Sequence, residues 1–196
     1  MTGAARRVVV GISGASGVIY GIRLLEALRQ DPAIETHLVI TPAGRITIAQ
    51  ETSWPVGQVE ALADVVHKPE NIGAGIASGS FATLGMAILP CSIKTLSAVA
   101  HSYADDLLVR AADVTLKEGR PLVLVVRETP LHLGHLRLMV QAAEMGAVIL
   151  PPMPAFYSRP QSVDDLVNET VGRILLRLGI DNGLYFEWLG LRGSRE

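Results

Sequence analysis

Five short runs of β-branched and apolar residues occur along the chain, each bounded by turn-forming residues. They cover residues 7–12, 35–41, 85–89, 121–126 and 147–150. The runs are apolar on both faces, which is typical of parallel strands that helices cover on both sides. Between them, apolar residues recur at helical spacing in three sets, which are Val18, Ile22, Leu25 and Leu28; Leu107, Leu108, Ala111, Ala112 and Leu116; and Leu136, Met139, Val140 and Ala143. This alternation predicts an α/β fold built on a doubly wound parallel sheet.

Cap residues indicate where the helices begin and end. Gly119 and Gly146 stand where the C-caps of two crossover helices are expected. Ser162 and Asp165 form an N-terminal capping signature for a last helix. No internal repeat or low-complexity linker divides the chain, so we predict one domain.

The composition is apolar for a chain of this size. Hydrophobic residues make up 49% of the 196 residues, and the mean hydropathy is positive. A single domain over residues 1–196, with a C-terminal tail from about residue 180, has a limited interior. Part of the apolar surface is therefore expected to lie between the subunits of a homo-oligomer. The formal net charge of -2, with Lys and Arg scattered, argues against nucleic acid as a partner.

The chain carries no signal for export or for membrane insertion. Cys91 is its one cysteine, so no internal disulfide can form, and residues 1–8 lead into a strand rather than a signal peptide. The longest apolar stretches, residues 122–126 and 147–150, are far shorter than the roughly 18 residues that span a bilayer. We expect a cytoplasmic protein with no membrane partner.

A loop of small residues follows the first predicted strand. Residues 11–17 read GISGASG, and such residues let backbone N–H groups approach an anion at a helix N-terminus. The glycines do not have the spacing of a dinucleotide-binding loop, and no lysine follows to make a P-loop. The second strand ends at Thr41 without an acidic residue for an adenosine ribose. The pattern favours a mononucleotide, with a tight turn that binds no ligand as the alternative.

Two further segments carry small or polar residues at informative places. Residues 90–95, PCSIKT, follow the third strand, and Ser92 is either a ligand contact or a plain helix N-cap. Cys91 is expected to be a small buried residue rather than a nucleophile, because no base is suggested nearby. Residues 71–81, NIGAGIASGSF, read as an ordered loop whose role composition alone leaves open.

At this point the chain resembles the UbiX/Pad1 flavin prenyltransferases, a family that includes the B subunits of hydroxyarylic acid decarboxylases. The resemblance covers nearly the whole length, in six ordered blocks. The blocks are SGASG at 13–17, the ETSW segment from Glu51, ASGSF at 77–81, PCSIKTLSAVA at 90–100, RAADVTLKEGRPLVLVVRETP at 110–130, and GAVILPPMPAFYSRPQSVDDLV at 146–167.

The resemblance implies both an architecture and an activity. It implies a flavodoxin-like or Rossmann-like sheet, and trimers that assemble into a dodecamer. The activity it implies is transfer of a dimethylallyl group from dimethylallyl phosphate to N5 and C6 of reduced FMN, without a metal. The product would be prenylated FMN for a partner UbiD-type decarboxylase.

The resemblance also implies a set of site residues. The expected FMN contacts are Gly14, Ala15, Ser16, Thr41, Ser92, Ile93, Lys94, Thr95 and Arg127. The expected contacts to dimethylallyl phosphate are Arg110, Lys117, Arg127, Glu128, Tyr157, Arg173 and Trp188, with Ala77, Ser78, Gly79 and Ser80 from a neighbouring subunit. Arginine suits phosphate through its planar fork of donors.

The expected catalytic residues are Ser16, Glu51, Lys117 and Glu128. Ser16 would relay a proton near flavin N5, and Glu51 would act as the new ring closes. Glu128, beside phosphate, is the candidate proton shuttle, with an ion pair to a neighbouring arginine as its alternative.

Several of these residues also have structural interpretations. Arg110 and Lys117 lie two helical turns apart and would otherwise be a solvated helix face. Tyr157 is either a phosphate ligand or a core residue, and Trp188 is either an aromatic face for a cation or a packing anchor.

One segment departs from the expected pattern, and two other functions stay open. His132 and His135, in LHLGH, are expected to cap or pack, because no third metal ligand accompanies them. A flavin-dependent cysteine decarboxylase would carry a different segment at 90–95 and a catalytic histidine after the first helix. An FMN carrier or accessory subunit would need only the flavin contacts, and the presence of Glu51, Lys117, Glu128 and Tyr157 argues against it.

Overall fold

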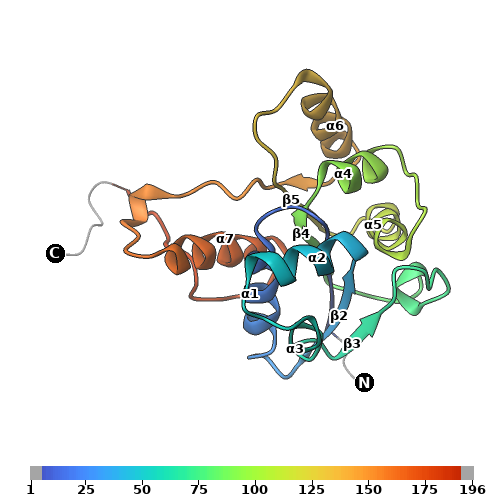
Figure 1. The fold of residues 1–196 in the computed structure, drawn as a ribbon, viewed down its shortest axis with the longest axis horizontal. Helices are drawn as coiled ribbons and strands as arrows, with labels where there is room; N and C mark the ends of the chain where they lie inside the picture. Colours follow the sequence, from blue (N-terminus) through green and yellow to red (C-terminus); the bar gives the residue numbers. More distant parts are fainter. Residues whose placement is uncertain (1–5, 191–196) are drawn as a thin grey trace.

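The structure is a computed structural model that describes residues 6–190 and shows one six-stranded parallel sheet flanked by helices (Figure 1). The strands are β1 (Arg6–Ile12), β2 (Ile34–Ile40), β3 (Val65–His67), β4 (Gly85–Cys91), β5 (Leu122–Val126) and β6 (Val148–Ile149). The α-helices are α1 (Val18–Leu28), α2 (Pro42–Glu51), α3 (Val56–Glu60), α4 (Ile93–Ala100), α5 (Leu107–Lys117), α6 (Leu133–Glu144) and α7 (Val163–Arg177). Two short 3-10 helices are η1 (Gly75–Ala77) and η2 (Phe156–Ser158).

The strand order is β3-β2-β1-β4-β5-β6, and all neighbouring strands run parallel. This is the Rossmann-like order, in which the chain turns back between β1 and β4. The predicted fold class is confirmed, and all five predicted strands are present. Thr41 lies just beyond β2 and caps α2 instead, and β6 is shorter than expected. β3, a short strand at the edge of the sheet, was not predicted.

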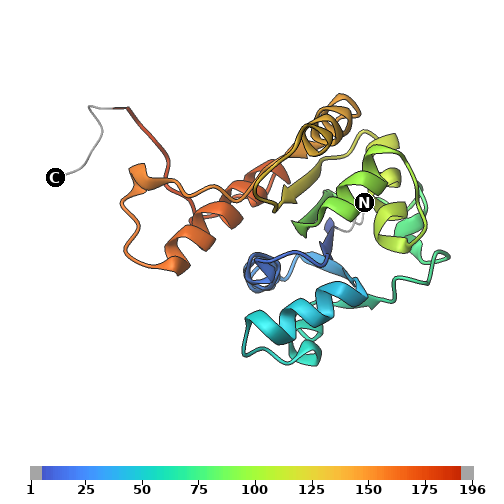
Figure 2. The same ribbon diagram turned by 45° about the horizontal axis from the view of Figure 1, so that its top comes forward.

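Two apolar layers hold the helices against the sheet (Figure 2). On one face, residues of α1 and α7 pack with the side chains of β1 and β2 that point toward them. On the other face, residues of α4, α5 and α6 pack against β4 and β5. The strands are buried on both faces, which explains why their sequences are continuous apolar runs rather than alternating ones.

The predicted helix ends are observed. Gly119 and Gly146 follow α5 and α6 with φ of 65° and 102°, in the left-handed region that glycine tolerates. The Ser162 side chain accepts from the N–H of Asp165, whose carboxylate accepts from the N–H of Ser162, so the capping box of α7 is complete.

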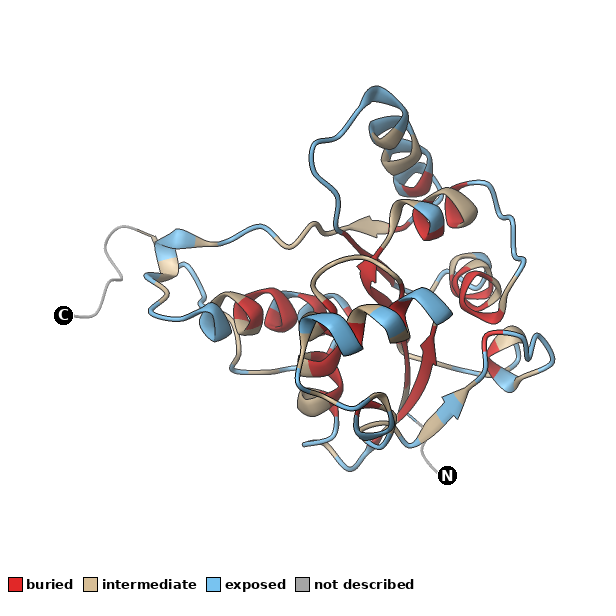
Figure 3. Ribbon diagram, in the orientation of Figure 1, coloured by how far each residue is buried: buried red, intermediate tan, exposed pale blue. Residues whose placement is uncertain are grey.

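Exposed large apolar side chains gather in two regions, apart from single ones such as Ile46, Ile72 and Tyr103. One is the outer face of α6, which is largely exposed, as the pale blue ribbon of Figure 3 shows. The other comprises residues 150–160 and the last described residues, which extend together from the sheet beyond α7 (Figure 1). No helix among residues 6–190 is long and apolar enough to cross a membrane.

Candidate functional site

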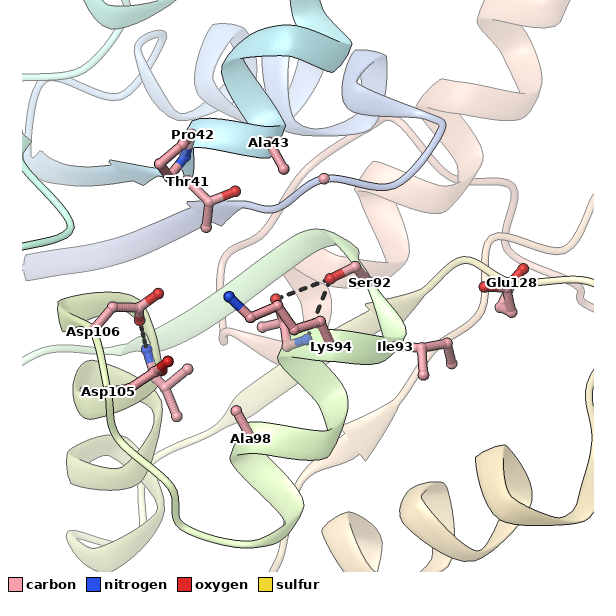
Figure 4. Close-up of a pocket in the computed structure, with 13 residues that line it drawn as sticks. Thr41, Pro42, Ala43, Ser92, Ile93, Lys94, Ala98, Asp105, Asp106 and Glu128 are labelled. Atoms are coloured by element: carbon pink, nitrogen blue, oxygen red, sulfur yellow. Dashed lines mark hydrogen bonds between the residues drawn. The ribbon is translucent and has the colours of Figure 1, made fainter.

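A cavity lies at the carboxyl ends of β1, β2 and β4, where the strand order reverses. Doubly wound sheets place ligands at this switch point, because the loops after the two central strands diverge there. Its volume is ≈ 470 Å³. The cavity is lined by Gly14, Thr41, Pro42, Ala43, Ser92, Ile93, Lys94, Thr95, Ala98, Asp105, Asp106, Val109 and Glu128, most of which are labelled in Figure 4.

The cavity contains six of the nine predicted FMN contacts. They are Gly14, Thr41, Ser92, Ile93, Lys94 and Thr95. Figure 4 shows Thr41 and Ala43 on one wall and Ser92 and Lys94 on the facing wall. The sequence reasoning missed Asp105 and Asp106, because acidic residues just before a helix read as ordinary caps. Asp106 does cap α5, accepting from the N–H of Val109 at 2.9 Å.

Helix caps fix both walls of the cavity. The Thr41 hydroxyl accepts from the N–H of Gly44 at 3.0 Å and begins α2. The Ser92 hydroxyl accepts from the N–H of Thr95 at 3.2 Å and begins α4, so the N-cap interpretation of Ser92 is confirmed. Ser13 joins the two sides, since its hydroxyl donates to the carbonyl of Pro90 at 2.9 Å and accepts from the N–H of Ser92 at 2.8 Å.

The loop of small residues allows a close approach of two chain segments. A Cβ placed on Gly14 would lie 2.3 Å from the Cβ of Ala43, so a larger residue would push α2 away from the loop. Gly17 has a φ of 97° and leads directly into α1.

The anion at the N-terminus of α1 is a side chain of the protein. The Glu51 carboxylate accepts from the N–H of Gly17 at 2.8 Å and from the N–H of Val18 at 3.4 Å. The sequence indicated an anion at this helix end but did not identify Glu51 as its source. The contact joins residues 34 positions apart, and a tertiary contact of this kind leaves no local pattern.

Glu51, Ser16 and Arg127 form one electrostatic group. Partial burial by itself raises the pKa of Glu51, but hydrogen bonds from Ser16, Gly17 and Val18 and the charge of Arg127 outweigh it and lower the pKa. The carboxylate is therefore ionised at neutral pH and can accept a proton. Arg127 also acts on Tyr20, whose pKa is raised by burial against the opposing effects of Thr170 and Arg127.

A second cavity of ≈ 430 Å³ lies between α7 and residues 148–157. Tyr157 and Arg173, two of the predicted donor contacts, line it together with Thr170 and Glu169. The Tyr157 ring lies 5.8 Å from the ring of Trp188 and is exposed, so the core interpretation of Tyr157 is wrong. Thr170, which lines this cavity, hydrogen bonds to Tyr20, whose pKa also responds to the charge of Arg127.

Glu128 is exposed at the rim of the first cavity, directly after Arg127. Its carboxylate accepts only from the N–H of Thr129, at 3.1 Å. Among residues 6–190 it forms no ion pair, so the ion-pair alternative for Glu128 has no support. Arg127 and Glu128 directly follow the buried strand β5 and lie at its carboxyl end, where a bound ligand can contact them.

Two of the predicted donor contacts lie away from these cavities. Arg110 pairs with Asp113 at 2.8 Å, and Lys117 with Glu118 at 2.5 Å, on the exposed side of α5. Lys117 ends α5 just before β5 begins, whereas Glu128 lies just after β5 ends. The length of the strand separates them, so Lys117 cannot complete the site of its own chain.

Lys117 lies instead beside the loop that contains residues 77–80. A Cβ on Gly79 would come within 2.7 Å of the Lys117 Nζ. Arg120 holds the loop, donating to the carbonyl of Gly79 at 2.7 Å and of Phe81 at 2.8 Å. The predicted ordered loop is thus confirmed, and it forms one surface with the end of α5.

Cys91 and the paired histidines have structural roles. Cys91 is fully buried, and burial raises the pKa of its thiol to about 12, so it is not a nucleophile at neutral pH. His132 caps α6, accepting at Nδ1 from the N–H of Gly134 at 3.0 Å, and its ring lies against the tilted ring of His135. Within the described part of the chain, no group of three potential ligands could hold a metal ion.

The comparisons with known proteins agree with this geometry. The family model described as Flavoprotein matches residues 2–175. "Flavin prenyltransferase UbiX" of Escherichia coli (strain K12) is 63% identical over 187 residues, covering 94% of this chain and 99% of the relative.

Two solved structures share the fold at a TM-score of 0.91. One is described as AnUbiX (PadA1) in complex with FMN and dimethylallyl pyrophosphate; it is 48% identical and covers 94% of this chain and 98% of its own. The other, a dodecameric FMN-dependent Ubix-like decarboxylase from Escherichia coli O157:H7, is 48% identical and covers 94% of this chain and 100% of its own. The family model matches most of the chain, and the relatives are up to 63% identical over nearly its whole length, so the chain belongs to the UbiX family of flavin prenyltransferases.

Proposed function

We propose that this flavin prenyltransferase transfers a dimethylallyl group from a dimethylallyl phosphate ester to N5 and C6 of reduced FMN. The observation that carries the proposal is that Glu128 lines the same cavity as six of the predicted flavin contacts. An acid–base residue and a flavin crevice share one space, which an FMN carrier would not need.

The residues of the first cavity fit a flavin mononucleotide. The cavity lies between the start of α2 and the start of α4 and can take a planar ring, and the hydroxyls of Ser92 and Thr95 can hydrogen bond to ring atoms. Lys94 supplies a positive charge within the same cavity. When bound, reduced FMN supplies the nucleophilic ring atoms.

The donor is proposed to lie between Arg127 and the second cavity. Arg127, Arg173 and Tyr157 would bind its phosphate, because guanidinium groups and a hydroxyl all donate hydrogen bonds to phosphate oxygens. Tyr157 and Trp188 would face the developing allylic cation, since aromatic faces attract positive charge. The apolar residues of the second cavity would exclude water from the dimethylallyl group.

Two proton carriers flank this space. Glu128 would give a proton to the departing phosphate, and Glu51 with Ser16 would hold and move a proton near flavin N5. Its lowered pKa keeps the Glu51 carboxylate ionised, and therefore in the form that can receive a proton, but also makes it a weak base that would pass the proton on rather than retain it.

We also propose that Arg110, Lys117 and residues 77–80 act in the site of a neighbouring subunit. In their own chain, Lys117 and residues 77–80 lie at the opposite end of β5 from Glu128 and share one surface. Arg110 directly follows Val109, which lines the first cavity, and pairs with Asp113.

The test is incubation of the purified protein with FMN, a reductant and dimethylallyl phosphate, followed by mass spectrometry of the bound flavin. We expect FMN to bind at one per subunit and to gain the mass of one C5H8 unit. A parallel arm with dimethylallyl diphosphate identifies the preferred donor. A protein that binds FMN but leaves it unmodified with both donors would be a carrier, and one that binds NAD but not FMN would contradict the flavin site itself.

The assembly is expected to be a closed homo-oligomer of at least three subunits, and of twelve if it follows its dodecameric relative. The exposed apolar face of α6, with Leu133 60% and Val140 57% exposed, needs a covering surface. Sedimentation velocity at micromolar concentration measures this. Val140→Glu should shift the distribution to smaller species, and a wild-type protein that sediments as a monomer would refute the prediction.

The product is proposed to serve a UbiD-type decarboxylase in the cytoplasm. Addition of the reacted mixture to an apo-decarboxylase of this type should produce activity only when all three reactants were present. A flavin-dependent cysteine decarboxylase, the other alternative, would release carbon dioxide from a C-terminal cysteine peptide without a prenyl donor.

A further inference from the structure

Glu169, in the middle of α7, is the one carboxylate residue among those that line the second cavity. It is 6% exposed, and a carboxylate at this depth is unfavourable unless hydrogen bonds or an ion pair compensate. Its Oε2 accepts from the backbone N–H of Phe186 at 2.7 Å. Among residues 6–190, no donor meets its Oε1, and no cation pairs with it. Its one hydrogen bond therefore holds a segment seventeen residues further along the chain.

The segment before Phe186 is fixed to α7 at two other points. The Asn182 side chain donates to the carbonyl of Gly172 at 3.1 Å and accepts from the N–H of Leu184 at 3.0 Å. A Cβ on Gly172 would lie 2.7 Å from the backbone N of Tyr185, so the segment runs directly against the helix there. Within the described residues, the hydrogen bond from the Phe186 N–H to Glu169 is the last one that joins this segment to α7 before Trp188.

The rings of Phe186 and Trp188 lie close to Tyr157, which lines the second cavity, and Phe186 itself lines a neighbouring cavity that Glu169 also lines. The Tyr157 ring lies 6.1 Å from the ring of Phe186 and 5.8 Å from that of Trp188. Phe186 is 46% and Trp188 54% exposed, so neither ring is fixed by the core. Their position over Tyr157 depends on the backbone that carries them, and that backbone is held by Glu169.

We infer that Glu169 is a positioning residue, which acts by tying the Phe186–Trp188 segment over Tyr157 and so closes the cavity that takes the dimethylallyl group. This inference rests on the proposed function for its substrate. Glu169 itself does not touch the flavin crevice, which lies in the other cavity. Its effect should therefore fall on donor binding and on the size of prenyl group accepted, and not on FMN.

The test compares Glu169→Leu, which removes the acceptor, with Glu169→Gln, which keeps a carbonyl acceptor for the Phe186 N–H. Asp164→Asn is the matched control, because Asp164 lies on the same helix but is exposed and pairs with Arg23. Acrylamide quenching of Trp188 in a Trp54→Phe background reports the position of the segment without any turnover. KM for dimethylallyl phosphate, kcat, and the ratio of rates with dimethylallyl and geranyl phosphates report the closure of the cavity.

Glu169→Leu should increase quenching of Trp188, raise KM for the donor about tenfold and reduce discrimination against geranyl phosphate, with the Kd for FMN unchanged. Glu169→Gln and Asp164→Asn should stay close to the unmodified protein. Two results would overturn the inference. One is that Glu169→Leu shows the same Trp188 quenching and donor KM as the unmodified protein, and the other is that Glu169→Gln changes them as much as Glu169→Leu does. If the unmodified protein makes no prenylated flavin, the proposed function fails, but the quenching result still decides whether the tie exists.

A double-mutant cycle covers the case in which Glu169→Leu disturbs folding. If Glu169 acts through Trp188, the donor KM of Glu169→Leu with Trp188→Ala should equal that of Trp188→Ala alone. Trp188→Ala removes an exposed ring and should leave the fold intact. Additive effects of the two substitutions would overturn the inference.

Discussion

Glu128→Gln is expected to slow formation of prenylated FMN by about 10² to 10⁴, the usual contribution of a general acid–base group, with FMN still bound. Glutamine keeps the shape of the side chain and a hydrogen bond to phosphate but removes the exchangeable proton. Ground-state binding should therefore survive while proton transfer fails. The measurement is single-turnover kinetics with saturating donor, followed through the flavin spectrum.

The control for this substitution is Glu144→Gln, at the exposed end of α6 and outside both cavities. It should react at the unmodified rate. If Glu128→Gln also reacts at that rate, or fails only because FMN no longer binds, the proton-shuttle role is wrong. The structure already gives Glu128 no ion pair among the described residues, so a lost ion pair could not explain a slow variant.

The sequence was sufficient to predict the sheet and a ligand site at the carboxyl ends of its strands because both depend on local patterns. Continuous apolar runs identified the buried strands, and Ser92 identified the start of α4 at the end of one of them. β3 was not predicted because it is three residues long and partly exposed at the sheet edge, where burial does not impose an apolar pattern on the sequence. α2 has mixed polar and small residues and lacks a clear apolar face, so only Pro42 and the Thr41 cap indicate it.

Contacts between distant segments account for what the sequence did not reveal. Glu169 reads as an ordinary polar helix position, and nothing near it indicates that its partner is the N–H of Phe186. The same holds for Glu51 at the start of α1. Arg120, which holds the 77–80 loop, resembles any basic residue after a helix C-cap. The separation of Lys117 from Glu128 also required the fold, because only the direction of β5 places them at opposite ends of the strand.

That separation leads to a prediction about mixed oligomers. Lys117→Ala alone should weaken donor binding, since it removes a phosphate charge, and Glu128→Gln alone should slow the chemical step. If Lys117 serves a neighbour, oligomers assembled from equal amounts of the two variants contain sites with an intact Glu128 from one chain and an intact Lys117 from another. Random assembly makes about a quarter of the sites complete, so a comparable fraction of the wild-type rate should return.

Co-expression of the two variants with different affinity tags, followed by tandem purification, isolates the mixed oligomers for single-turnover assay. Mixing the two purified homo-oligomers without subunit exchange is the control and should recover nothing. If both residues served the same chain's site, every site in the mixed oligomer would lack one of them, and no activity above the two separate variants would appear. The recovered fraction therefore distinguishes a site shared between subunits from one completed within a single chain. The same two variants are used under either arrangement, so only the origin of Lys117 and Glu128, from one chain or from two, can change the recovered activity.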